Sequence, residues 1–257
     1  MYGKLYRTRG LIIKKRNYRE MDKVVVVLSN DFGRIEILVR GARKTGNIYS
    51  GLLEPMIVGD FCLSKGRTWD NINDLALVSN FTQLLGEKNL VVYRGASFIL
   101  NILNKISTID SDENSYFSLA INYFDGMVND FQLLENSDKM RMYLCSFMMS
   151  VLAVSGRLPC FLGCTICSGE GCQDGDGWNL SCQGLVHRQC LVSREFYEPT
   201  LVLSEKDKVN LEKLLVLPGK KFIWQDMDKY DIEKLYSIST FLLSSYLGQE
   251  IKTGAFL

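Results

Sequence analysis

Apolar and polar positions alternate in short runs along the first eighty residues, as they do in strands that bury one face. Turn residues interrupt the runs, for example Asp31-Phe-Gly33 and Lys65-Gly66, and the longest connection spans residues 40–52. The pattern predicts five strands, at residues 5–15, 23–28, 34–39, 56–64 and 73–78. Five strands with one long connection after the third are typical of the OB-fold barrel, although an SH3-like barrel or a simple meander would give the same strand count.

Beyond residue 81 the apolar residues recur every three or four positions, which indicates helices. Three apolar stripes follow one another and a fourth lies near the end of the chain, and such stripes usually face a core. Their members are Leu90, Tyr93, Ala96 or Ser97, Leu100 and Leu103; Tyr116, Leu119, Ala120 and Tyr123; Tyr143, Phe147, Val151 and Val154; and Ile232, Leu235, Ile238, Leu242 and Tyr246. We therefore expect helices to follow the barrel.

Cap residues mark where some of these helices begin and end. Gly156 should end the third helix, because glycine relaxes a last turn into the left-handed conformation. Ser204 with Asp207 resembles a capping box, which would start a further helix. The sequence thus predicts an α+β protein, with an OB-fold barrel in residues 1–80 and a helical domain in residues 81–257.

The formal charge of +1 is distributed unevenly along the chain. Residues 1–80 contain fourteen Lys/Arg and eight Asp/Glu, whereas the remainder holds sixteen Lys/Arg and twenty-one Asp/Glu. A basic barrel followed by an acidic helical region suggests that the barrel meets a polyanion, while the second part binds proteins or keeps the molecule in solution.

Two pairs of metal-type ligands stand near the middle of the chain. Cys164 and Cys167 form one pair, and His187, the only histidine, forms the other with Cys190. Two such pairs, each with two intervening residues, predict a four-coordinate zinc site without an open position, so the ion would stabilise structure and would not catalyse. Cys182 in place of His187 is the main alternative.

Basic residues crowd the third predicted strand and the connection after it. Arg34, Arg40, Arg43 and Lys44 lie within eleven positions, where they would neutralise phosphates along one rim of a small barrel. A solvated loop is the other interpretation of the same charges. Further cations are predicted near other turns of the barrel, and three aromatic residues could stack on bases or simply pack: Lys14, Lys15, Arg16, Arg19, Lys65 and Arg67, with Tyr18, Tyr49 and Trp69.

Catalytic arrangements are hard to assemble from this sequence. With His187 committed to a metal, no imidazole remains to activate a nucleophile, and there is no glycine-rich phosphate loop. We therefore expect a protein that is not an enzyme. The N-terminus lacks the pattern of a signal peptide and no apolar run is long enough to cross a bilayer, so we expect a cytoplasmic protein with no membrane contact.

Several short segments, in this order, resemble the RecO family of bacterial recombination mediators over nearly the whole chain. They are Tyr18-Arg-Glu-Met-Asp22, Gly33, Val39-Arg-Gly-Ala-Arg-Lys44, Leu53-Glu-Pro-Met56, Ser155-Gly-Arg-Leu-Pro159 leading into Cys164-Thr-Ile-Cys167, Gln183-Gly-Leu-Val-His-Arg-Gln-Cys190, and Ile251-Lys-Thr253. The family commonly has paired glycines and a second pair of cysteines in the sixth segment. Here His187 stands in place of a cysteine and Gln183 in place of a glycine.

The resemblance implies an OB-fold domain, a helical domain and a zinc element inserted in the latter at about residues 160–195. It implies ATP-independent binding of single- and double-stranded DNA, annealing of strands coated by single-strand binding protein (SSB), and cooperation with RecR to load RecA in the RecFOR pathway of repair. Such a protein would be associated with the nucleoid. Arg34, Arg40, Arg43 and Lys44 carry over as DNA contacts. The C-terminal tail of SSB would dock on the helical domain, for which the candidates are Arg94, Lys105, Arg141 and Arg157.

Overall fold

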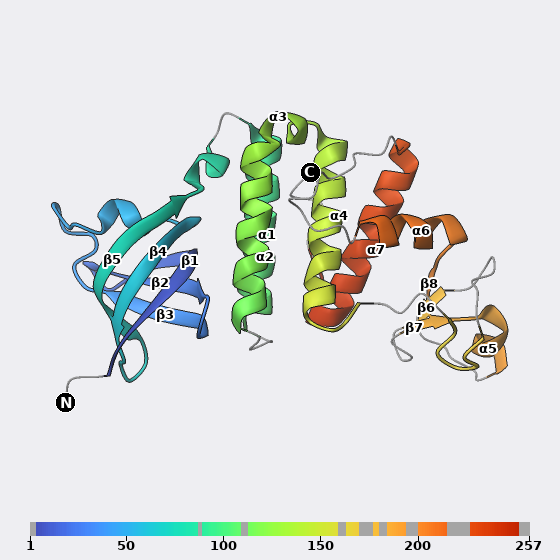
Figure 1. The fold of residues 1–257 in the computed structure, drawn as a ribbon, viewed down its shortest axis with the longest axis horizontal. Coiled ribbons are helices and arrows are strands. Elements are labelled where there is room, and N and C mark those ends of the chain that lie inside the picture. The colour runs from blue at the N-terminus through green and yellow to red at the C-terminus, as the bar shows by residue number, and fades with distance from the viewer. Residues whose placement is uncertain are drawn as a thin grey trace. The chain divides into compact units, whose positions relative to one another are not determined.

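The computed structural model of this chain divides into two compact units (Figure 1). It describes residues 4–86, 89–108, 113–158, 163–169, 177–179, 184–193, 200–214 and 227–251. Of these, the residues up to Asn136 form the first unit and those from Ser137 onward the second.

A closed five-stranded barrel forms the first part of unit one. Its strands are β1 (Leu5–Tyr18), β2 (Asp22–Ser29), β3 (Gly33–Val39), β4 (Ile57–Ser64) and β5 (Asp70–Asn80). They close in the order β1-β2-β3-β5-β4, with all pairs antiparallel except the short parallel pairing of β3 with β5. The predicted OB-fold barrel is therefore confirmed, and the long connection after the third strand carries the short 3-10 helix η1 (Ser50–Leu52).

The barrel buries side chains on its inside and, at β2, on its outside as well. Val25, Val27 and Ile37 belong to the interior core, where each is fully buried. Val24, Val26 and Leu28 point to the opposite face of β2 but are also buried. They are covered because α1 (Leu90–Ile106) and α2 (Glu113–Asn129) pack against β1, β2 and β3. The uninterrupted run of four valines is thus explained by helices on the outer face of the strand.

Helices α1 and α2, with the short helix α3 (Phe131–Leu134), complete unit one after the 3-10 helix η2 (Thr82–Leu85). The side chain of Asn89 caps α1 by accepting from the backbone N–H groups of Val91 and Val92. The predicted helix is confirmed, but the expectation that its whole stripe lies in the core is wrong in the first turn. Leu90 and Tyr93 are 56% and 41% exposed. The core face of that turn is instead formed by Val92.

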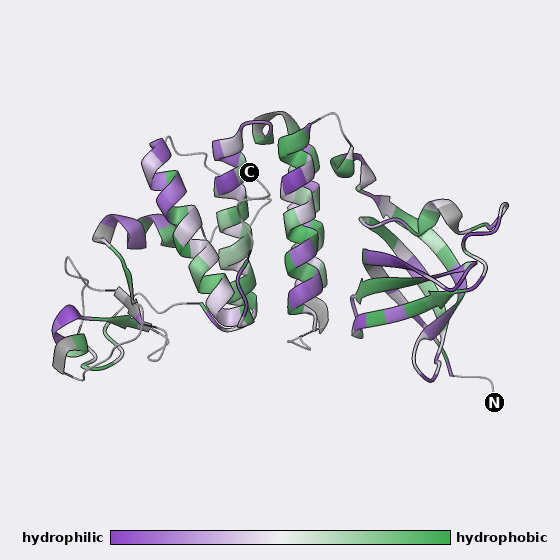
Figure 2. Ribbon diagram, turned by 180° about the vertical axis from the view of Figure 1, so that it is seen from behind, coloured by the Kyte–Doolittle hydropathy of each residue, from purple (hydrophilic) through white to green (hydrophobic). Residues whose placement is uncertain are grey.

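Unit two contains three longer helices and a small sheet. The helices are α4 (Ser137–Val154), α6 (Glu205–Lys213) and α7 (Lys229–Leu247), and α4 packs along α7 (Figure 1). The sheet has the order β7-β6-β8, built from β6 (Gly177–Asn179), β7 (Gly184–Val186) and β8 (Thr200–Val202), and α5 (Arg188–Ser193) follows β7. Figure 2 shows hydrophobic and hydrophilic positions mixed along these helices, and every residue of α4 from Met142 to Leu152 is buried.

The predicted helix boundaries in unit two agree with the structure. Gly156 adopts a φ of 65° just beyond α4, as a left-handed residue that ends a helix does. The backbone N–H of Ser204 donates to Asp207 at 2.7 Å while the Asp207 N–H donates to the Ser204 hydroxyl at 3.2 Å, which is a capping box at the start of α6.

The domain boundary proposed at residue 80 coincides with the end of the barrel, because β5 ends at Asn80. The compact unit that contains the barrel, however, also includes α1, α2 and α3, and the boundary between the two units follows Asn136. The division into an OB-fold domain of residues 1–80 and a helical domain of residues 81–257 therefore stays a prediction about domain organisation.

Candidate functional site

Three predicted DNA-binding residues lie together on the connection after β3, which we call the basic rim: Arg40, Arg43 and Lys44. All three side chains are exposed. Gly41, with a φ of 64°, starts the turn, and the Lys44 N–H donates to the Gly41 carbonyl at 2.9 Å. Among the residues that the structure describes, Arg40 and Lys44 have no ion-pair partner. The rim is therefore free to meet anions from solution.

The basic rim is fastened to the turn between β1 and β2. The Gly41 N–H donates to the Asp22 carboxylate at 2.8 Å, and the Arg43 N–H donates to the Met21 carbonyl at 3.0 Å. The Arg43 guanidinium also donates to the Glu20 carbonyl at 2.8 Å. These bonds hold the rim in one conformation, so a binding anion need not order a free loop.

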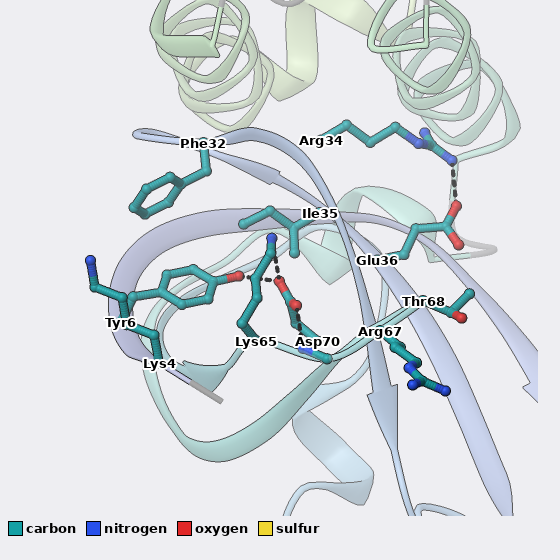
Figure 3. Close-up of a pocket in the computed structure, with 11 residues that line it drawn as sticks. Lys4, Tyr6, Phe32, Arg34, Ile35, Glu36, Lys65, Arg67, Thr68 and Asp70 are labelled. Atoms are coloured by element: carbon teal, nitrogen blue, oxygen red, sulfur yellow. Dashed lines mark hydrogen bonds and ion pairs between the residues drawn. The ribbon is translucent and has the colours of Figure 1, made fainter. Parts of the chain in front are cut away.

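Arg34 lies apart from the rim at the opposite end of β3, where its guanidinium is held by protein groups. It donates to the side-chain oxygen of Asn104 at 3.1 Å and to the Ser107 hydroxyl at 3.2 Å, both near the C-terminal end of α1. It also pairs with Glu36 at 3.2 Å (Figure 3). Arg34 thus clamps β3 to α1. The proposed contact of Arg34 with DNA stays a prediction. The hydrogen bonds of its guanidinium indicate a structural role for this residue.

Lys14, Lys15 and Arg16 lie near the end of β1, and their side chains are exposed. Lys15 pairs with Glu54, and Arg16 approaches Glu36 at 3.6 Å. Lys14 has no ion-pair partner among the described residues. The β1 cations therefore flank the barrel with part of their charge already compensated.

Two of the predicted stacking residues lie against each other. Tyr18 and Trp69 meet edge to face with ring centroids 4.7 Å apart, the Arg19 guanidinium lies 5.2 Å from the centre of Tyr18, and that of Arg16 lies 5.4 Å from Trp69. We call this set, Arg19, Tyr18, Trp69 and Arg16, the cation–aromatic stack. Tyr49 instead packs against the barrel core and donates to the Asn73 carbonyl at 3.1 Å, so it is a packing residue.

A hollow of about 620 Å³ opens beside Arg34, between the start of β3 and the loop from β4 to β5 (Figure 3). Lys4, Phe32 and Arg67 lie on its wall. Sequence spacing does not indicate this hollow, because its wall combines residues from separate segments of the chain.

The four predicted metal ligands, Cys164, Cys167, His187 and Cys190, come together in unit two. One ligand atom from each lies within 4.8 Å of every other, and the Cys167 sulfur is 3.4 Å from Nδ1 of His187. In a tetrahedral zinc site with Zn–S bonds of about 2.3 Å, sulfur atoms are separated by roughly 3.8 Å. The cluster is therefore of the size that such an ion requires. Cys182, the alternative ligand, lies outside the described residues.

The backbone around the cluster is shaped to hold thiolates. The His187 N–H points at the Cys164 sulfur at 3.4 Å, and the Thr165 N–H donates to the Leu185 carbonyl at 2.9 Å, which ties the first ligand pair to β7. A Cβ on Gly169 would lie 3.1 Å from the His187 ring and 3.2 Å from the Cys167 sulfur. Any larger residue at that position would require a ligand to shift by a few tenths of an ångström.

The pKa values of two thiols in the cluster are shifted in opposite directions. Burial acts to raise the pKa of Cys164, but backbone N–H groups from His187, Cys167 and Ile166 outweigh it and lower the pKa to about 7. Desolvation, and then the neighbouring Cys167 and Cys164, raises the pKa of Cys190 to about 11. Three thiolates so close repel one another, and a divalent ion removes that repulsion. Zn²⁺ fits this donor set of three sulfurs and one imidazole.

No helix in the described part of the chain is long and apolar enough to cross a membrane.

Comparisons with known proteins connect these features. Residues 1–81, the barrel, match the family model "Recombination protein O N terminal". Three curated relatives are all named "DNA repair protein RecO". The one from Caldicellulosiruptor bescii is 23% identical over 164 residues, which are 64% of each chain. That from Rubrobacter xylanophilus is 25% identical, covering 72% of this chain and 71% of its own. That from Alkaliphilus metalliredigens is 24% identical, covering 90% and 97%. The match to the Alkaliphilus metalliredigens protein spans both units, so the chain is similar to RecO proteins over most of its length.

Proposed function

We propose that this protein acts in DNA repair and recombination as a non-catalytic, ATP-independent DNA-binding protein that anneals complementary strands. The observation that carries the proposal is the basic rim, whose cations are exposed and held in place by the β1–β2 turn. It is supported by the name "DNA repair protein RecO" that the relatives bear.

Strand annealing requires two polyanions to approach each other. Arg40, Arg43 and Lys44 would lower their repulsion by neutralising phosphates and releasing counterions, while base pairing supplies the sequence specificity. Guanidinium groups suit this task, since they bind phosphate oxygens in a fixed fork. The protein would then bind all sequences with similar affinity.

The metal site has a structural part in this proposal. Cys164, Cys167, His187 and Cys190 would hold Zn²⁺, which supplies no reactive position once four protein ligands surround it. The ligands join the strand β7 and the helix α5 to the segment that begins at residue 163. The ion would therefore stabilise this element, and the expected consequence of its loss is local unfolding.

The partners that we propose are RecR, the C-terminal tail of SSB and, through them, RecA. The proposal follows the family resemblance. Among the candidates for the acidic tail of SSB, Arg141 lies on α4, where its guanidinium bonds the Asp138 carboxylate at 2.9 Å; an acidic tail would have to compete with Asp138 for it. An annealing assay with and without SSB tests this part of the proposal directly.

Charge reversal on the rim tests DNA binding. The double variant Arg43→Glu with Lys44→Glu should weaken binding to single-stranded and duplex oligonucleotides of any sequence, and should slow annealing. The slope of log K against log salt should fall by about 0.7 per lost contact on single strands. The matched control is Lys213→Glu with Lys229→Glu, which makes the same charge change on exposed residues of unit two.

The outcome that contradicts the proposal is wild-type affinity and annealing in the rim variant at low salt. If the wild-type protein itself binds no oligonucleotide in dilute buffer, the alternative of a scaffold that only joins repair proteins is supported instead.

A further inference from the structure

The hollow beside Arg34 lies next to the short pairing of β3 with β5 that closes the barrel. β3 pairs with β5 only at Ile37 and Leu38, so Gly33 to Glu36 have no partner strand on that side among the described residues. The loop from β4 to β5 faces this free edge, and the two enclose about 620 Å³ (Figure 3). Pockets for small ligands range from about 300 to 1,000 Å³, so one nucleotide unit fits here and a duplex does not.

An aromatic ring stands at the mouth of the hollow. Phe32 is 48% exposed although it is large and apolar. Its ring meets that of Tyr6 in an edge-to-face arrangement, with ring centroids 5.0 Å apart. The turn that carries it is fixed, because the Ser29 hydroxyl accepts from the N–H groups of Asp31 and Phe32, both at 3.1 Å. A preordered, exposed ring is a platform on which a base can stack.

The charges around the hollow favour a polyanion. Lys4 and Arg67 are exposed and, within the described residues, have no ion-pair partner. Lys65 bonds the Asp70 carboxylate at 3.4 Å but keeps 69% of its side chain exposed. The hollow therefore presents three accessible cations at its edge.

Both carboxylates on the wall are compensated. Asp70 is buried and accepts from the Tyr6 hydroxyl and from the Gly66 N–H at 3.0 Å. Glu36 accepts from the Trp69 ring N–H at 3.1 Å and pairs with Arg34. Because each negative charge is held by internal donors, neither faces an incoming phosphate alone.

The cation–aromatic stack connects the basic rim to the hollow. Tyr18 ends β1 next to the turn that holds the rim, and its ring touches Trp69 in the loop that walls the hollow. Rim and hollow stand at the two ends of β3, roughly 20 Å apart for seven residues at about 3.3 Å each. A single strand that follows this path meets cations and ring faces in succession.

We infer that the hollow takes one unstacked base of single-stranded DNA on Phe32, with the adjoining phosphates at Lys4 and Arg67, and that this base contact makes the protein bind single strands more tightly than duplex. The inference rests on the proposed DNA-binding function. A paired base inside a duplex cannot reach the ring, whereas both forms of DNA reach the exposed rim.

The test compares Phe32→Ala, Phe32→Tyr and the wild type in the full-length protein. Affinities are measured for a labelled oligothymidylate and for a duplex of equal length, at one low salt concentration. Phe32→Ala should weaken binding to single strands about tenfold and change binding to duplex less than twofold. Phe32→Tyr keeps an aromatic ring and should bind single strands as the wild type does. Leu5→Ala, an exposed apolar residue that does not line the hollow, serves as the control.

Two further measurements distinguish the loss of a base contact from misfolding of the Phe32→Ala variant. Arg67→Gln, at an exposed position, should lower the salt slope for single strands by about 0.7 and leave that for duplex unchanged. A 2-aminopurine base in the oligonucleotide should be quenched by the wild type and not by Phe32→Ala. Equal losses for single strands and duplex, or no loss for single strands, would overturn the inference. Absence of all DNA binding by the wild type would instead count against the proposed function.

Discussion

Gly169 is the residue on which the geometry of the metal cluster depends most directly. A methyl group there would press on both the His187 ring and the Cys167 sulfur, at 3.1 and 3.2 Å. Gly169→Ala should therefore displace a ligand and weaken metal binding about tenfold, as changes next to the ligands commonly do. Competition with a zinc chelator measures the effect. Gly51→Ala, where a Cβ meets nothing within 4 Å, should leave metal retention unchanged, and equal retention in both variants would refute the prediction.

Arg34 allows a structural role to be separated from DNA binding. Its guanidinium bonds Asn104, Ser107 and Glu36, so Arg34→Gln should leave these acceptors partly unsatisfied. We expect the free energy of unfolding in urea to fall by about 1–3 kcal/mol. Arg43→Gln, at an exposed position, should change it by less than about 0.5 kcal/mol and yet lose more DNA affinity. If Arg34→Gln is as stable as the wild type, the hydrogen bonds of Arg34 contribute nothing to the free energy of unfolding.

Asp207 in the capping box of α6 should make the stability of unit two depend on pH, and the direction of its pKa shift gives the sign. Burial acts to raise the pKa of Asp207, but the ion pair with Lys234 and the donors of Ser204 lower it overall. A depressed pKa in the folded state means that this carboxylate stabilises the fold above the unfolded value of about 3.9, and that the contribution disappears as pH falls below it. Asp207→Asn should cost about 1 kcal/mol at pH 7.

Melting curves from pH 7 to pH 3 check that dependence. The difference in melting temperature between the wild type and Asp207→Asn should be full above about pH 5 and should shrink as the pH falls below the unfolded pKa toward the depressed folded pKa of Asp207. Glu233→Gln, on the exposed side of α7, provides the control and should follow the wild type throughout. A difference that stays constant with pH would show that the ion pair is not its source.

The five barrel strands could be predicted from their alternation, but their ends could not. The first was expected to end at residue 15, whereas β1 continues to Tyr18 because its exposed last residues pair with Val24, Lys23 and Asp22 of β2. Apolar patterning cannot reveal a strand whose side chains all face water. The three-residue strands of the small sheet carry too few side chains to show a period at all.

The rim and the metal cluster were predictable because the rim lies on one loop and the cluster consists of two closely spaced ligand pairs. Arg34 was grouped with the rim by sequence distance, and its main partner Asn104 lies seventy positions away on α1. The hollow was missed for the same reason, since Lys4, Phe32 and Arg67 come from three separate segments. Spacing along the chain can reveal a site whose residues come from one loop or from closely spaced ligand pairs. A site whose residues come from separate strands becomes visible only in the folded barrel.

Removal of the metal should affect one unit and spare the other. All four ligands lie between residues 164 and 190, within unit two, and the barrel belongs to unit one. Since a structural ion contributes its binding free energy to the fold around it, chelation should unfold the segment that contains β6, β7 and α5. Hydrogen exchange there should accelerate, while β1 to β5 and α1 keep their protection and oligonucleotide binding changes less than twofold. Cys167→Ser should reproduce the effect without chelator. Loss of protection in the barrel, or of DNA affinity, would mean that the metal site supports the DNA-binding unit as well, and would contradict the independence that the two units are expected to have.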